Sequence, residues 1–140
     1  MSERNVELFR RFVKAFNARD IEAMIAQCDP SIEFHSTFAA VGGAVYHGLD
    51  GLRDWHRDLA DAWREIRVEP GAYFDLGQDT LLVFVLHARG RHSRAEVAMP
   101  IASVTSWRDG LMIYFKNYTQ RDDALSDLGV SEDELEPIDP

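Results

Sequence analysis

Apolar residues recur with a helical period in the first half of the chain and with a period of two in the second half. The helical spacing predicts a first helix over residues 2–17, with an apolar stripe of Phe9, Phe12, Val13 and Phe16. A second helix is predicted from residue 21 to about Cys28. Asp20 can cap its start, and Asp29-Pro30 ends it because the residue before a proline avoids helical geometry.

The segment from Tyr46 to Trp63 predicts a helix that carries two tryptophans on its apolar side. A short strand over 32–37 and a loop over 38–47 precede it, and Gly48 leads into it. The helical stripe consists of Leu52, Trp55, Leu59, Ala62 and Trp63. Large rings on a helix that covers a sheet are suited to lining a hydrophobic pocket.

From Ile66 onward the period of two predicts four strands, over residues 66–76, 80–91, 95–107 and 111–119. Short connections join them, and Asp109-Gly110 is a strong hairpin signal because both positions of such a turn need a positive φ. These strands therefore form an antiparallel meander.

A closing helix is predicted over residues 122–128 and ends at Gly129. Residues 131–140 are acidic and lack apolar periodicity, so we expect a mobile tail after a single domain over 1–130. Helices that precede a meander indicate an α+β domain: a cone-shaped, cystatin-like barrel with N-terminal helices packed on a curved, mostly antiparallel sheet that encloses a pocket.

The hairpins predict which strand residues share the pocket face, provided that the register is correct to one residue. A turn centred on Ser93 places His87 opposite Met99, and a turn centred on Asp109 places Ser103 opposite Phe115. The predicted cavity face then carries Val83, Val85, His87, Arg89, Val97, Met99, Ile101, Ser103, Ile113, Phe115 and Asn117.

Polar groups at one end of this apolar face are the candidates for chemistry. His87 could shuttle protons near neutral pH, and Arg89 could hold an enolate or carboxylate oxygen. His35 is a second candidate acid or base. Alternatively, His87 and Arg89 lie solvated at the rim of the sheet, His35 is a surface histidine, and Asn117 bonds to backbone.

The residues predicted to contact a ligand come from the first helix, the tryptophan segment and the strands. They are Phe12, Tyr46, Trp55, Trp63, Arg89, Met99, Ser103, Phe115, Asn117 and Gln120. The opposite face is also apolar, with Leu82, Phe84, Leu86, Ala88, Ala98, Ala102 and Tyr118 beside Glu96 and Lys116, which predicts a homodimer through that face.

The net charge of −9 argues against a nucleic-acid partner, because phosphate binding needs a basic surface. The longest apolar run has six residues, Leu81 to Leu86, and no signal peptide opens the chain, so we expect a cytoplasmic protein without a membrane partner. Cys28 is the single cysteine, and the five histidines lack metal-binding spacing, so no metal or other cofactor is expected.

Three segments carry a resemblance to a known family: Phe16-Asn17-Ala18-Arg19-Asp20, the run from Tyr46 to Leu52, and Arg108-Asp109-Gly110 with the run from Tyr118 to Leu125. From Glu7 to Gly129 the chain resembles SnoaL-like proteins of the nuclear transport factor 2-like, ketosteroid-isomerase-like superfamily. The resemblance implies a cone with a deep pocket, often dimeric, in proteins that include isomerases, cyclases, epoxide hydrolases and non-catalytic members.

The catalytic residues of these relatives do not carry over. The acid/base aspartate of SnoaL-like polyketide cyclases aligns with Gln120, whose amide cannot exchange a proton near neutral pH. The tyrosine and two aspartates of ketosteroid isomerases align near Phe12, with 35–37 and with 102–103, where neither a phenol nor a carboxyl group is present. The Asp-Arg-Asp set of limonene-type epoxide hydrolases is not evident either.

Two functions therefore remain open. The first is a protein that binds a small apolar, polyketide-like or steroid-like molecule without turnover. The second is an isomerase or cyclase that acts through an enolate, with His87 or His35 moving the proton and Arg89, Asn117 and Gln120 stabilising the oxygen. A third reading, a structural dimer module, predicts a cavity filled by the tryptophans.

Overall fold

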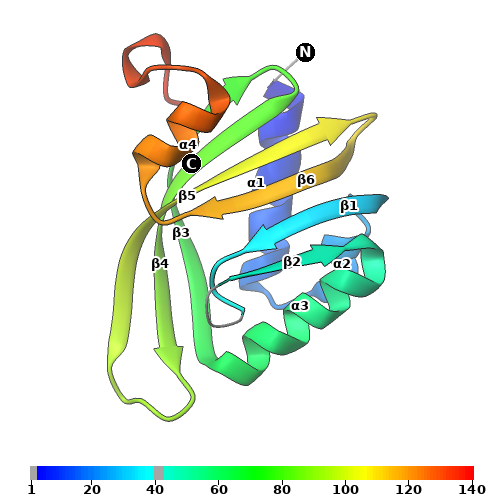
Figure 1. The fold of residues 1–140 in the computed structure, drawn as a ribbon, viewed down its shortest axis with the longest axis vertical. Coiled ribbons are helices and arrows are strands. Elements are labelled where there is room, and N and C mark those ends of the chain that lie inside the picture. The colour runs from blue at the N-terminus through cyan, green and yellow to red at the C-terminus, as the bar shows by residue number, and fades with distance from the viewer. Residues whose placement is uncertain (1–2, 40–42) are drawn as a thin grey trace.

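Helices and one mixed sheet make up the computed structural model, which describes residues 3–39 and 43–140 (Figure 1). The helices are α1 (Glu3–Asn17), α2 (Ile21–Ile25), α3 (Gly48–Ala62), α4 (Arg121–Leu128) and the 3-10 helix η1 (Glu132–Glu134). The strands are β1 (Cys28–Ser36), β2 (Ala44–His47), β3 (Trp63–Leu76), β4 (Asp79–Gly90), β5 (Glu96–Arg108) and β6 (Leu111–Tyr118). They lie in the order β2-β1-β6-β5-β4-β3, and only β1 and β6 pair in parallel within the described residues. The predicted α+β architecture is confirmed.

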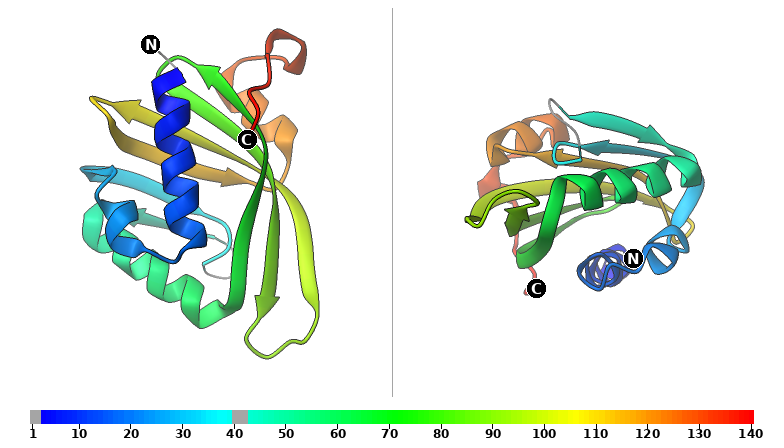
Figure 2. Two further views of the ribbon diagram at one scale, coloured as in Figure 1. Left: turned by 180° about the vertical axis from the view of Figure 1, so that it is seen from behind. Right: turned by 90° about the horizontal axis from the view of Figure 1, so that it is seen from below.

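The two faces of the sheet carry different helices. Helix α1 crosses one face, and α4 lies on the other (Figures 1 and 2). Helix α3 joins α1 on its side, because its buried residues Leu52, Trp55 and Leu59 belong to the same apolar cluster as Phe9 and Phe12 of α1. We call the face covered by α1 and α3 the inner face and the opposite one the outer face.

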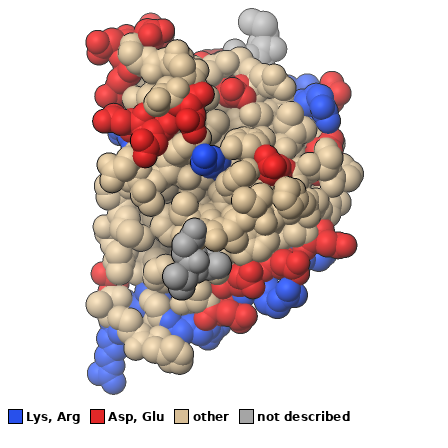
Figure 3. Space-filling view, in the orientation of Figure 1, with Lys and Arg blue, Asp and Glu red and all other residues tan. Residues whose placement is uncertain are grey.

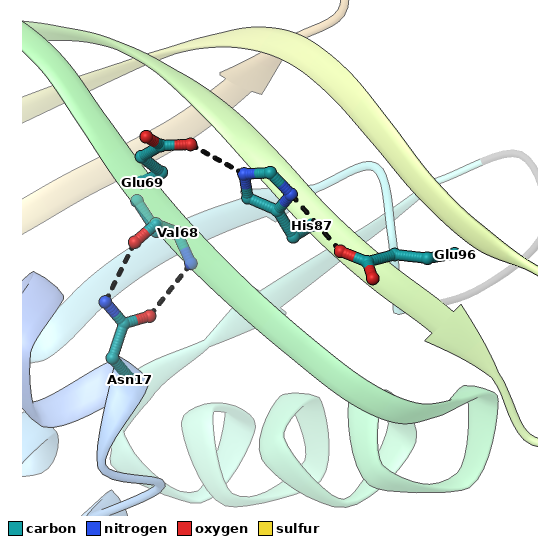
Figure 4. Close-up of polar contacts among 5 residues, drawn as sticks. All are labelled: Asn17, Val68, Glu69, His87 and Glu96. Carbon is teal, nitrogen blue, oxygen red and sulfur yellow. Dashed lines mark hydrogen bonds and ion pairs between the residues drawn. The ribbon is translucent and has the colours of Figure 1, made fainter.

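The C-terminal end of α1 is fastened to the edge of the sheet by a side chain. Asn17, its last residue, donates from Nδ2 to the carbonyl oxygen of Val68 at 2.9 Å and accepts from the Val68 N–H at 2.8 Å (Figure 4). Strand β3 is an edge strand, and such edges leave backbone groups unpaired. The carboxamide of Asn17 therefore imitates a neighbouring strand and fixes the end of α1 over β3.

The boundaries differ from prediction in three places. Helix α2 ends at Ile25, and Cys28 begins β1, so the cysteine is the first residue of a strand instead of the end of a helix. Strand β2 forms inside the predicted loop, of which residues 40–42 lie outside the described part of the chain. Trp63 begins β3, with φ −123 and ψ 128, instead of closing the tryptophan helix.

The largest difference from prediction is the register of β4 against β5. His87 lies opposite Ala98 and Arg89 opposite Glu96, one residue away from the predicted pairs. Because side chains alternate along a strand, this shift moves every β4 side chain to the other face. Between β5 and β6 the shift is two residues, with Ser103 opposite Asn117, so their faces are as predicted.

The acidic C-terminal segment, for which mobility stays a prediction, contacts the sheet. After η1 the chain returns to β3, where the Tyr73 N–H donates to the Ile138 carbonyl at 2.9 Å and the Ile138 N–H donates to Tyr73 at 2.7 Å. Ile138 also packs against the main apolar cluster. One apolar side chain and one strand bridge thus anchor a segment that shows no periodic pattern.

Candidate functional site: an aromatic cavity on the inner face

A cavity of about 50 Å³ lies between α1, α3 and the inner face of the sheet. Its apolar walls are Phe9, Phe12, Val13, Phe16, Phe38, Trp55, Leu59, Ile66, Val68, Leu82, Phe84, Leu86 and Phe115. Among the described residues its polar walls are Ser36, Ser103 and Asn117, and no titratable side chain lines it. A charged ligand atom would find no opposite charge inside, and burying such a charge unpaired is costly.

A ladder of aromatic rings supports one wall of the cavity. Phe34 lies parallel to Phe115, with ring centroids 4.1 Å apart and an interplanar angle of 2°. Trp55 of α3 tilts onto Phe34 at 4.5 Å, and Phe16 of α1 stacks on Trp55 at 5.8 Å. This ladder of rings joins both helices to the sheet, and such pairs add to the stabilisation from burial.

Asn117 and Ser103 form a polar site within this apolar surface. The Asn117 Nδ2 donates to the Ser103 Oγ at 2.8 Å, and both side chains are buried. An Asn carboxamide has a second N–H and a carbonyl oxygen, and a serine hydroxyl has its own hydrogen to donate. This Asn117–Ser103 pair therefore keeps unused hydrogen-bonding groups at a cavity wall that is otherwise almost entirely apolar.

Five predicted ligand-contacting residues line this cavity: Phe12, Trp55, Ser103, Phe115 and Asn117. The expectation that Asn117 bonds only to backbone is wrong, because its partner is a side chain. The structure leaves an open space between the rings, so the tryptophans do not fill the cavity.

Tyr46 and Trp63 lie elsewhere, in contacts that hold the wall together. The Tyr46 hydroxyl donates to Asp58 of α3 at 2.7 Å, and burial together with Asp58 raises the pKa of Tyr46 to about 12. The Trp63 Nε1 donates to the carbonyl oxygen of Phe38 at 2.9 Å. Neither residue borders the cavity.

The Tyr46-His47-Gly48 motif has a structural explanation. Gly48 starts α3 with φ +72, a conformation that glycine adopts without strain. A Cβ on Gly51 would lie 3.1 Å from the Tyr46 carbonyl carbon, so a larger residue there would require α3 and β2 to move slightly apart.

The predicted cavity positions of His87 and Arg89 are wrong. Both lie on the outer face, where the His87 Nε2 contacts Glu69 at 2.7 Å and its Nδ1 lies 3.4 Å from Glu96 (Figure 4). An Arg89 Nη lies 3.8 Å from the same Glu96. The group is a partly exposed charge network on the side of the sheet away from the cavity.

His35 and Gln120 are likewise outside the cavity. His35 pairs with Lys116 of β6 on the outer face, where its Nε2 lies 3.1 Å from Glu33. Gln120 precedes α4 and borders a separate hollow of about 470 Å³ on the outer face, beside Val83 and Pro100. Met99 is on the inner face opposite Leu86 but does not line the cavity.

Several cavity residues were not predicted. Leu82, Phe84 and Leu86 of β4 line it in place of Val83, Val85 and His87, as the register requires. Ser36 lies two residues after Phe34 on the same face of β1, so strand alternation would have indicated it. The apolar stripe of α1 predicted that its residues are buried, but it could not show whether they line a cavity or fill the core.

In the described residues, no group of three or more His, Cys, Asp and Glu side chains could hold a metal ion. Cys28 is buried, and burial raises the pKa of its thiol to about 12, which makes it a poor nucleophile. No helix in residues 3–39 and 43–140 is both long enough and apolar enough to cross a membrane.

The SnoaL-like domain model matches residues 9–115, which is more than half of the chain. The chain belongs to the SnoaL-like domain family. A search of curated protein sequences found no match.

Solved structures share the fold of this SnoaL-like domain at low sequence identity. An NTF2-like protein of unknown function from Burkholderia pseudomallei is 17% identical, with a TM-score of 0.77 over 88% of this chain and 95% of that one. TerC, co-crystallised with polyporic acid, is 16% identical, with a TM-score of 0.75 over 89% and 97%.

A third structure is a hypothetical protein of ketosteroid isomerase-like fold from Catenulispora acidiphila, in complex with trimethylamine. It is 14% identical, with a TM-score of 0.73 over 91% of this chain and 95% of that one. At these identities the likeness shows the NTF2-like fold alone.

Proposed function

We propose that this SnoaL-like domain binds a small, largely apolar molecule in the inner cavity, without turnover. The observation that carries the proposal is the Asn117–Ser103 pair, a buried polar site in a wall of aromatic and aliphatic side chains. A concave apolar site with few polar groups is the usual form of a small-molecule site. Structures of the same fold hold polyporic acid and trimethylamine, which supports the binding of a small molecule here.

The size of the cavity limits the ligand. Its volume of about 50 Å³ is smaller than the roughly 150 Å³ of an engineered protein cavity that binds benzene. A ring-sized ligand therefore has to displace a wall residue as it enters. Phe16 and Phe38 are half-buried and are the aromatic walls with the most freedom to move.

A matched pair of ligands tests the role of the Asn117–Ser103 pair. Acetophenone and ethylbenzene have similar shapes, but only the ketone offers an oxygen that accepts a hydrogen bond. We expect the wild-type protein to prefer acetophenone by about tenfold in NMR titrations, the value of one net hydrogen bond. Asn117→Leu should abolish this preference, while His87→Gln on the outer face should keep it. Failure of both ligands to shift cavity resonances would contradict the proposal.

The alternative enzyme needs an acid or base beside the ligand. His87 and His35 both lie on the outer face, and among the described residues no titratable group lines the cavity. The geometry therefore favours binding over an enolate mechanism with a histidine as proton shuttle.

The homodimer remains a proposal, with its interface redefined by the observed register. The outer face presents Val83, Val85, Ala98 and Pro100, all half-buried or exposed. Figure 3 shows a mostly uncharged area on this side, between the acidic α4 region and the charged residues along the lower edge. We expect light scattering to give twice the chain mass for the wild type and the chain mass for Val85→Glu.

A cytoplasmic location and the absence of nucleic-acid and membrane partners also remain predictions from composition.

A further inference from the structure

A second hollow adjoins the inner cavity between the end of α1 and the C-terminal half of α3. It measures about 20 Å³ and is lined by Phe16, Arg19, His56, Leu59, Ala60 and Ile66. Three of these residues, Phe16, Leu59 and Ile66, also line the inner cavity. One apolar wall thus separates a neutral interior from a small site that contains an arginine and a histidine.

We propose that this second hollow is the entrance to the inner cavity and holds the carboxylate of an amphipathic ligand whose apolar body lies inside. The inference rests on the proposed function and names the ligand class: a small monocarboxylate with a cyclic or branched hydrocarbon body. Arg19 supplies the positive charge, and His56 supplies a ring nitrogen beside it.

Arg19 has capacity to bind an anion. Within the described residues its guanidinium makes one hydrogen bond, from Nη2 to the carbonyl oxygen of Arg64 at 3.2 Å, and no ion pair. A guanidinium has five N–H donors in a planar fork that matches a carboxylate. Most of its donors are therefore available to a ligand at the entrance.

The backbone of Arg19 is held in an unusual conformation. It has φ +58, a left-handed geometry at a helix end that usually carries glycine. Its N–H donates to Phe16 at 3.0 Å, and the Asp20 N–H donates to Ala15 at 2.9 Å, which closes the helix. A long cationic side chain at a position that favours glycine costs stability, and ligand binding provides a reason for its presence.

His56 complements the arginine. Burial lowers the pKa of His56, and the neighbouring Arg19 lowers it further, so the neutral ring is favoured at pH 7. A neutral imidazole donates one N–H, which can add a second hydrogen bond to a carboxylate held by Arg19. No carboxylate side chain among the described residues lines this hollow and competes for these donors.

The carboxylate has to stay at the entrance, because the inner cavity offers only neutral dipoles. The net charge of −9 opposes an anionic ligand only weakly at this distance, since physiological salt screens exposed charges beyond about 8 Å. Phe16 separates the two spaces, and its outward rotation joins them into one site.

A charged ligand and its neutral amide test the entrance. We expect the wild-type protein to bind 3-phenylpropanoate about tenfold more tightly than 3-phenylpropanamide by calorimetry or NMR, as a charge-assisted hydrogen bond allows. Arg19→Gly should remove this difference without loss of stability, because glycine adopts the local φ freely. Arg11→Gln, an exposed arginine of α1, is the matched control and should keep the preference.

The outcomes separate this proposal from the binding function. Equal affinity of the two ligands in the wild-type protein, or an unchanged preference in Arg19→Gly, overturns the carboxylate site and leaves cavity binding intact. If neither ligand binds and acetophenone also fails to bind, both proposals are overturned.

Discussion

The inner and outer faces of this sheet are built from the same strands but have opposite chemistry. Along β4, Leu82, Phe84 and Leu86 point into the cavity, while His87 points outward between two glutamates. The inner face excludes charge and stacks rings, and the outer face pairs charges in partial contact with water. His87 and Arg89, which the sequence suggests as catalytic candidates, thus lie on the outer face. The inner face is suited to binding a ligand through its shape and one polar contact.

The aromatic ladder should dominate the stability of the inner face. Phe34 is fully buried, stacks on Phe115 and contacts the tilted ring of Trp55, so Phe34→Ala leaves a large void. We expect a loss of about 3–5 kcal/mol in the free energy of unfolding, measured with urea. The outer-face control, Val45→Ala on β2, concerns a side chain that is 47% exposed, and it should change stability by at most about 0.5 kcal/mol.

The Asn117–Ser103 pair should show an intermediate effect that depends on how it is removed. Asn117→Ala leaves the Ser103 hydroxyl buried without its partner and should cost about 1–3 kcal/mol. The double variant Asn117→Leu/Ser103→Ala replaces both polar groups and should unfold at nearly the wild-type urea concentration. If the double variant is as unstable as the single one, the hydrogen bond itself stabilises the fold, and the pair is present for stability more than for ligand binding.

The outer charge network should contribute much less. Glu96→Gln removes the carboxylate shared by His87 and Arg89, and exposed pairs of this kind are worth about 0–1 kcal/mol. We expect a small change in the urea midpoint that shrinks further in 0.5 M NaCl, with cavity binding unaffected. A loss of acetophenone binding in this variant would connect the two faces and contradict the separation described above.

The smallest expected effect is the pH dependence from His56. Burial lowers the pKa of His56 in the folded protein, and Arg19 lowers it further. As the pH falls below about 6.5, His56 therefore becomes protonated in the unfolded chain before it does in the folded protein. Stability should therefore fall as the pH decreases from 6.5 through the lower folded-state pKa. Urea midpoints at pH 7.5 and 5.5 should differ less in His56→Gln than in the wild type. Identical differences would show that His56 does not contribute.

The fold was predictable because its signals are local. The apolar stripe of α1, the start of α3 at Gly48 and the Asp109-Gly110 hairpin each depend on neighbouring residues only, and each appears in the structure. Strand β2 was missed because its four residues, Ala44–His47, are too few to show a clear alternation, although its partner β1 is close in the sequence. The anchoring of Ile138 was missed because its partner Tyr73 lies far away in the sequence.

The sequence alone determined the element types, the α+β class and the aromatic character of the cavity, since periodicity and composition act over a few residues. Only the tertiary structure decided which face of β4 is inside. His87 and Leu86 are adjacent in the chain, and a shift of one residue in a hairpin exchanges them between solvent and cavity. Burial decides between the two registers, because pairing Arg89 with Glu96 buries the leucine and phenylalanine side chains of β4 under α1 and leaves the charged side chains outside.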